Sequence, residues 1–133
     1  MTSTTTASAR AQITDEVTTW PGVTTAGPGE RGEFSYMLGR REIGHLHGSR
    51  VAHFSFQRQL GAELRAAGRV VPHPITDSPS LGAKPIEGPD DVAEVIALLR
   101  INYERLLARY GLPPEASESP GASDRPGATR PVS

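Results

Sequence analysis

Two histidines spaced two residues apart are the side chains of this sequence best suited to chemistry. His45 and His47 lie in residues 41–47, a stretch whose pattern predicts a strand. Side chains two residues apart leave the same face of a strand, from Cα atoms about 6.5 to 7 Å apart. Imidazole exchanges protons near neutral pH and is a common metal ligand. The pair could therefore act as a general base or hold a metal ion.

His73 is the third candidate, because prolines on both sides restrict its backbone and could hold its ring over a sheet. Strict alternation points Glu42 to the opposite face from His45. A site of two histidines and one carboxylate would then need an acid from the loop around Asp77. The alternative for each histidine is a structural role, either as a buried group with backbone partners or as an exposed loop residue.

Two further side chains are candidates for binding a ligand. Tyr36 lies on the preceding predicted strand, where regular pairing places it opposite Ile43 and one pair away from His45. It is therefore the aromatic side chain expected to contact a bound molecule. Arg41 follows the turn between the two strands, and its guanidinium could bind an anionic group with two hydrogen bonds or could remain in solvent.

These residues depend on a predicted three-stranded antiparallel meander. Residues 33–38, 41–47 and 50–56 are the strands, and Gly39-Arg40 and Gly48-Ser49 are the expected two-residue turns. This register places His45 opposite Ala52. It puts both histidines of the pair on the apolar face with Tyr36, and it puts His53 on the other face.

The whole chain is expected to form an α+β fold. Shorter helices are expected within residues 9–19 and 57–67, brief strands near 70–71 and 81–86, and a long helix from Pro89 to Tyr110. The result is an antiparallel β-meander of three to five strands, covered on one face by the long C-terminal helix and one or two shorter helices. The domain is predicted to span residues 10–111. The low-complexity ends, residues 1–9 and 112–133, are expected to be disordered tails.

Composition excludes several classes of function. The 14 basic residues are balanced by 15 acidic ones, which disfavours nucleic acid and anionic membranes as partners. No cysteine is present, so any metal would need His, Asp or Glu ligands. No apolar run has membrane-spanning length, and a cytoplasmic location is expected by default. No phosphate-binding glycine loop or nucleophile elbow occurs, no cofactor is evident, and no pattern specifies an oligomeric state.

One stretch resembles a known family. Positions 41–48 have the sequence Arg-Glu-Ile-Gly-His-Leu-His-Gly. A helix ending in glycine follows, then His73-Pro74, and then the long helix within residues 87–109. This combination is similar to the luciferase domain family. This family contains small bacterial proteins and the fungal luciferases. The resemblance extends over roughly residues 20–109.

The fungal relatives imply an oxygen-dependent conversion of a hydroxylated, polyphenol-like pyrone without flavin or nicotinamide, and the matching residues are Glu42, His45, His47 and His73. A histidine base suits this chemistry, because removing a proton from a phenol or enol gives an anion that reacts with O₂. The partner is then a small hydroxylated organic molecule in a histidine-lined pocket, and the enzyme would resemble a cofactor-independent oxygenase. Two alternatives remain open: a metal-binding protein using His45, His47 and His73, and a non-catalytic binding module.

Overall fold

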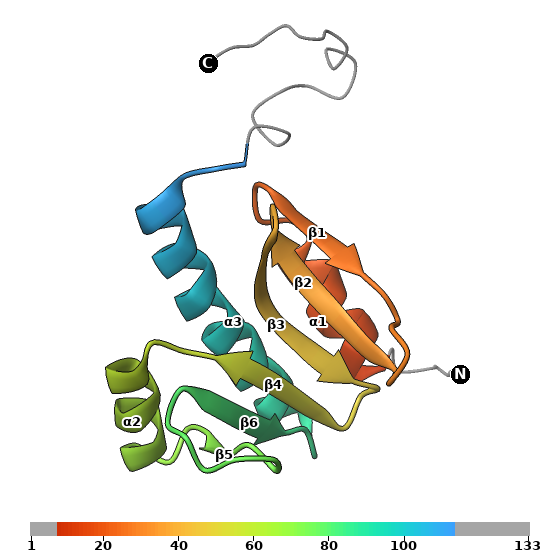
Figure 1. The fold of residues 1–133 in the computed structure, drawn as a ribbon. Coiled ribbons are helices and arrows are strands. Elements are labelled where there is room, and N and C mark those ends of the chain that lie inside the picture. Colours follow the sequence, from red (N-terminus) through yellow and green to blue (C-terminus); the bar gives the residue numbers. More distant parts are fainter. Residues whose placement is uncertain (1–7, 114–133) are drawn as a thin grey trace, which may run out of the picture.

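The computed structural model describes residues 8–113, which form one six-stranded sheet and three helices (Figure 1). The strands are β1 (Val23–Ala26), β2 (Glu33–Leu38), β3 (Arg41–His47), β4 (Val51–Ser55), β5 (Val71–Pro72) and β6 (Leu81–Pro85). The helices are α1 (Ala9–Val17), α2 (Arg58–Ala66) and α3 (Pro89–Tyr110). The strand order is β1-β2-β3-β4-β6-β5, and all neighbours are antiparallel. The predicted α+β fold is confirmed, but the sheet has six strands and not the three to five that were expected, because β1 adds an edge strand beside β2.

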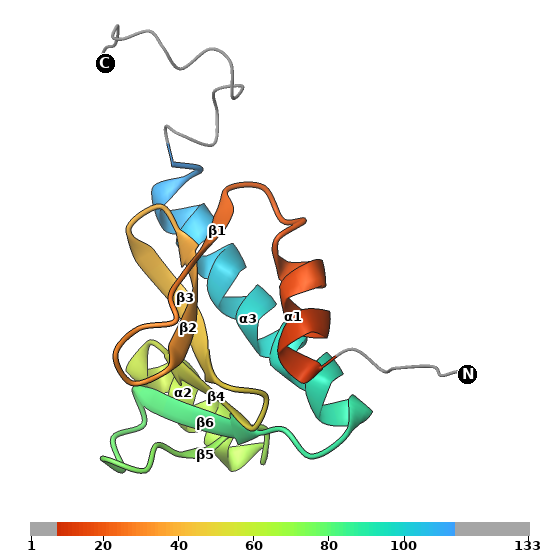
Figure 2. The same ribbon diagram turned by 90° about the vertical axis from the view of Figure 1, so that its right-hand side faces the viewer.

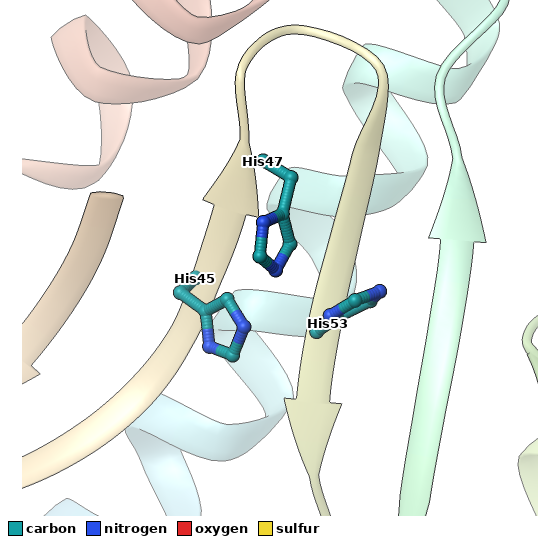
Figure 3. Close-up of side chains that lie close together, drawn as sticks. All are labelled: His45, His47 and His53. Carbon is teal, nitrogen blue, oxygen red and sulfur yellow. The ribbon is translucent and has the colours of Figure 1, made fainter. Parts of the chain in front are cut away.

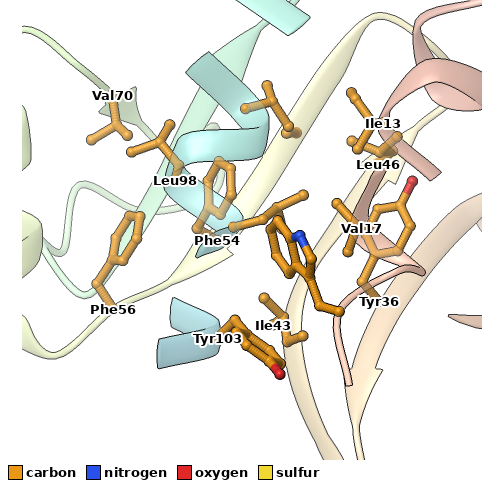
Figure 4. Packing of buried hydrophobic residues seen from close by; sticks show 14 of the residues in the cluster. Ile13, Val17, Tyr36, Ile43, Leu46, Phe54, Phe56, Val70, Leu98 and Tyr103 are labelled. Atoms are coloured by element: carbon orange, nitrogen blue, oxygen red, sulfur yellow. The ribbon is translucent and has the colours of Figure 1, made fainter. Parts of the chain in front are cut away.

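Helices α1 and α3 pack against each other and cover the same face of the sheet (Figure 2). Helix α3 begins as the sequence predicts, with Pro89 in its first turn and two acidic residues at its positive N-terminal end. It ends at Gly111, whose φ of +74° favours glycine. Its apolar stripe meets the sheet in one core (Figure 4), to which both layers contribute fully or almost fully buried side chains: Tyr36, Ile43, Leu46, Phe54, Val95, Leu99 and Tyr103.

Helix α1 is fixed to the core by apolar burial and by one partly buried hydroxyl pair. Ile13 and Val17 are completely buried. The hydroxyl oxygens of Thr14 and Tyr36 lie 2.7 Å apart in a hydrogen bond between α1 and β2. At the N-terminus of the helix, the Ser8 hydroxyl accepts a hydrogen bond from the Ala11 backbone N–H. The short N-terminal helix suggested by the sequence is therefore a full part of the domain.

The edges of the domain differ slightly from the prediction. Val23–Ala26 forms the exposed edge strand β1 beside β2, a strand that was not among those predicted. Helix α1 starts at Ala9, within the segment expected to be a tail. Residues 1–7 and 114–133 lie outside the described residues, so most of both predicted tails does too. Among the described residues, no helix has the length and apolar character needed to cross a membrane. The cytoplasmic location stays a prediction.

A bulge in β3 turns its two histidines to the other face of the sheet. The pairing with β2 starts as expected, but Tyr36 then lies opposite Gly44 and not opposite Ile43. One extra residue in β3 moves every later side chain to the opposite face. The prediction that His45 and His47 share the apolar face with Tyr36 is therefore wrong, and they face away from α3.

The turn between β3 and β4 also contains one residue more than expected. It consists of residues 48–50, so His45 lies opposite His53 and not opposite Ala52. Directly paired residues share a face of the sheet. The prediction that His53 points away from His45 is therefore wrong as well, and these two histidines project together from adjacent strands.

Asn102 of α3 stabilises the sheet next to the bulge. Its buried side-chain amide donates hydrogen bonds to the carbonyl oxygens of Ile43 in β3 at 3.0 Å and of Ser55 in β4 at 2.9 Å. The neighbouring Gly44 allows β3 to lie close to α3, since a Cβ atom there would be only 2.7 Å from the Leu99 Cδ2 atom. Helix α3 thus satisfies the carbonyl group that the irregular strand leaves without a regular partner.

Replacing Asn102 with leucine should destabilise the fold by about 2 to 4 kcal/mol, because two carbonyl groups lose their donor while the side-chain shape is roughly kept. The free energy of unfolding from urea titration measures this loss. Glu104→Gln on the exposed side of the same helix is the matched control, with an expected change below about 0.5 kcal/mol. Equal stability losses in the two variants would contradict this role for Asn102.

Candidate functional site

The four histidines of the chain gather on the face of the sheet that α1 and α3 leave uncovered. His45 and His47 come from β3, His53 from β4, and His73 from the loop after β5. The ring centroids are 5.0 Å apart for His45 and His47, 5.2 Å for His45 and His53, 4.6 Å for His47 and His53, and 4.3 Å for His53 and His73. Figure 3 shows the three strand histidines side by side. Register, not sequence proximity, brings His53 into this cluster.

Glu42 forms a close pair with His45. Its Oε2 atom lies 2.7 Å from the His45 Nδ1 atom, and its Oε1 atom accepts a hydrogen bond from the Ser35 hydroxyl at 3.4 Å. A carboxylate only accepts hydrogen bonds, so the His45 Nδ1 atom carries the proton in this pair. The Nε2 atom of the neutral ring then keeps its lone pair. The pair exists because the bulge brings Glu42 and His45 to the same face, against the prediction of opposite faces.

His53 is the most buried of the four histidines, with 8% of its surface exposed. Burial, together with the neighbouring His73, His47 and His45, lowers its pKa to about 4, and the Glu42 carboxylate offsets part of this effect. His53 is therefore neutral at pH 7. A neutral imidazole with an available lone pair can accept a proton or bind a metal ion.

His73 is held in one tautomer by its own loop. Its Nδ1 atom accepts a hydrogen bond from the Ile75 backbone N–H at 3.1 Å, so the neutral ring carries its proton on Nε2. Burial and the positive charges that His45 and His47 can carry lower the pKa of His73. In this arrangement His73 is a hydrogen-bond donor through Nε2 and not a base.

The cluster lines an open hollow with a volume of about 380 Å³, here called the histidine hollow. A hollow of this size suits a small organic molecule. Its lining combines the histidines with acidic, basic and apolar side chains: Arg31, Glu33, Ser35, Glu42, His45, His47, His53, His73, Pro74 and Ile75. Ile75 is 79% exposed and provides an apolar wall at its rim. The hollow can therefore contact the face of a ring while presenting imidazoles to its polar groups.

The structure brings only part of the predicted site together. The histidine hollow is lined by all four residues that match the luciferase domain family: Glu42, His45, His47 and His73. Tyr36 does not, because it is completely buried on the opposite face of the sheet. Its expected position beside the histidines followed from the register without the bulge and is wrong.

Arg41 also lies away from the histidine hollow. Its guanidinium carbon is 3.5 Å from the centroid of the Tyr110 ring, in a cation–π contact near the end of α3. It lines a separate hollow that shares no residue with the histidine hollow. Arg41, expected either to bind an anionic group or to remain in solvent, therefore does not line the histidine hollow.

His53 is the site residue that sequence reasoning missed. It was placed on the other face because the turn after His47 was taken to have two residues. A three-residue turn at Gly48-Ser49-Arg50 pairs His45 with His53 directly. The signal for that register was the histidine on the next strand, because this turn length places it directly opposite His45.

Together these features define a class of protein: an α+β domain with helices on one face of an antiparallel sheet and a histidine–glutamate cluster on the other. Residues 40–102 match the family model of the Luciferase domain. The matched segment contains the whole histidine cluster and ends at Asn102. Over this segment the chain is similar to the luciferase domain family, and the match supports the predicted resemblance. Neither the curated proteins nor the solved structures contain a match to the chain.

The lowered pKa of His53 should make folding sensitive to acid. Between about pH 6.5 and pH 4 the unfolded chain binds a proton at His53 while the folded protein does not, so the free energy of unfolding falls as the pH falls. His53→Gln, which cannot titrate, should lose less stability between pH 7 and pH 4.5. Thermal unfolding in the presence of EDTA, which keeps adventitious metal off the histidines, measures both proteins. Parallel pH curves would contradict the prediction.

Proposed function

We propose that this protein binds a small hydroxylated organic molecule in the histidine hollow, with the Glu42–His45 pair as the base that removes its hydroxyl proton. The supporting observation is the 2.7 Å contact between Glu42 and the His45 Nδ1 atom inside that hollow. Such a contact fixes the ring and leaves Nε2 able to accept a proton. The proposed substrate class, a phenol or an enol, comes from the resemblance to the fungal luciferases.

The other residues of the histidine hollow suit the anion that such a step produces. When Nε2 of His45 takes the proton, the Glu42 carboxylate stabilises the resulting imidazolium. The Nε2–H group of His73 is a donor for the phenolate or enolate oxygen. Arg31 adds a positive charge at the edge of the hollow. Pro74 and Ile75 provide apolar contact for an aromatic or pyrone ring.

The proposed reaction that follows is an oxidation by O₂. An electron-rich phenolate or enolate gives electrons to O₂, so the substrate is the reductant and O₂ is the oxidant. The support for this step is the luciferase domain match over residues 40–102, together with a histidine base of the kind such chemistry needs. We propose no flavin or nicotinamide for it.

The binding and deprotonation step can be tested with 4-nitrophenol, whose anion has a different visible absorption from the neutral phenol. Addition of the protein at a pH where the free phenol is mostly neutral should increase the anion signal, because Nε2 of His45 accepts the proton. Glu42→Gln and His45→Gln should each weaken this signal at least about tenfold. Glu63→Gln, an exposed carboxylate on α2, is the matched control and should leave it unchanged. An equal signal in all four proteins would contradict the proposed base.

Oxygen uptake tests the oxidation separately. In a panel of catechols and hydroxylated pyrones, at least one compound should cause protein-dependent consumption of O₂. Loss of the base in His45→Gln should lower this rate by about 10² to 10⁴-fold, the usual contribution of general base catalysis. Circular dichroism checks that the variant remains folded. Binding of a panel member without any oxygen uptake would instead support a non-catalytic binding protein.

A further inference from the structure

Three of the four histidines converge more closely than a proton-transfer site requires. One ring nitrogen from each of His45, His47 and His53 lies within 4.8 Å of the other two (Figure 3). Ligand nitrogens around a tetrahedral zinc ion with bonds of 2.0 to 2.1 Å are about 3.4 Å apart. Small rotations of the three rings would therefore bring their nitrogens to the spacing of a metal site.

The sheet itself sets this arrangement. His45 and His53 are directly paired across β3 and β4, and His47 is two residues further along β3 on the same face. Three ligands from two adjacent strands would occupy one side of an ion. Its remaining positions would then face the histidine hollow, where water or a small molecule could bind.

The hydrogen bonds of the cluster also match those of metal ligands. Glu42 accepts a hydrogen bond from the Nδ1–H group of His45. A metal-binding histidine commonly donates its second ring N–H to a carboxylate in this way. Within residues 8–113, the rings of His47 and His53 have ring contacts but no hydrogen bond to another group. Their lone pairs are thus available to an ion.

We propose that His45, His47 and His53 bind one divalent transition-metal ion. Three imidazoles without a carboxylate ligand suit ions such as Zn²⁺, Co²⁺ or Fe²⁺ and do not suit Mg²⁺ or Ca²⁺, which prefer oxygen ligands. The third ligand is His53 and not His73, the residue that the sequence alone suggests. The His73 Nδ1 atom already accepts the Ile75 N–H.

The metal site does not depend on the proposed organic ligand, because the three histidines would bind the ion without it. A bound ion would occupy the Nε2 lone pair of His45 that the proposed base uses. The ion would then assist deprotonation by lowering the pKa of a hydroxyl group bound at an open position. Metal binding and phenol binding are therefore measured in separate experiments, with the phenol titration carried out in EDTA.

Cobalt is the probe for the test, because its visible absorption reports coordination number. The untagged, EDTA-treated full chain is titrated with Co²⁺ and, by calorimetry, with Zn²⁺. We expect one ion per chain with the intense visible bands of a four- or five-coordinate site, and no heat with Mg²⁺. His47→Gln and His53→Gln should each weaken Zn²⁺ binding at least about 100-fold, and Glu42→Gln about 10 to 100-fold.

His73→Gln is the matched control, since it removes a neighbouring imidazole outside the three ligands; Zn²⁺ affinity should stay within about threefold of that of the unmodified protein. Two results would overturn the proposal. The first is a Co²⁺ spectrum like that of the hydrated ion at millimolar concentration. The second is an equal loss of affinity in His73→Gln and His47→Gln. His47 is only half-buried, so its variant remains informative if His53→Gln fails to fold.

Discussion

The side-chain amide of Asn102 is the contact on which the rest of the site depends. It reaches from α3 to the carbonyl groups of Ile43 and Ser55, one on β3 and one at the end of β4. A buried carbonyl without a partner is unfavourable, so an irregular strand under a helix needs a donor at that place. Asn102 supplies it, and the bulge becomes compatible with a closely packed core.

That bulge decides which chemistry the open face can carry. Without it, Glu42 and His45 would leave opposite faces, and His45 and His47 would lie under α3 among apolar side chains. Burying two imidazoles there would require partners that the core does not contain. With it, Leu46 enters the core, completely buried, and the polar side chains gather on the face open to solvent. One extra residue thus separates an apolar core from a polar site within one strand.

Much of the fold could be predicted because its signals are local. Pro89 and Gly111 mark the ends of α3, and alternating apolar residues mark β2, so the α+β class followed directly. The face carrying the histidines could not be predicted in the same way. It depends on the extra residue near Ile43 and on a turn of three residues, and both are fixed by contacts with distant segments such as Asn102. The nearest-neighbour pattern of a strand contains no information on such contacts, which is why Tyr36 was misplaced.

The two activities proposed for the histidine hollow use the same property of His45. Glu42 holds the proton on Nδ1, so a lone pair on Nε2 is directed by a rigid strand and not by a flexible loop. A proton and a metal ion compete for that lone pair, and acid therefore opposes metal binding. His53 strengthens the case for the ion, because burial keeps its ring neutral well below pH 7. A neutral, buried imidazole directly opposite His45 is of little use to a single proton transfer, whereas a metal ion needs several such rings at once. The position of His53 is thus the feature of the cluster that a base alone does not explain.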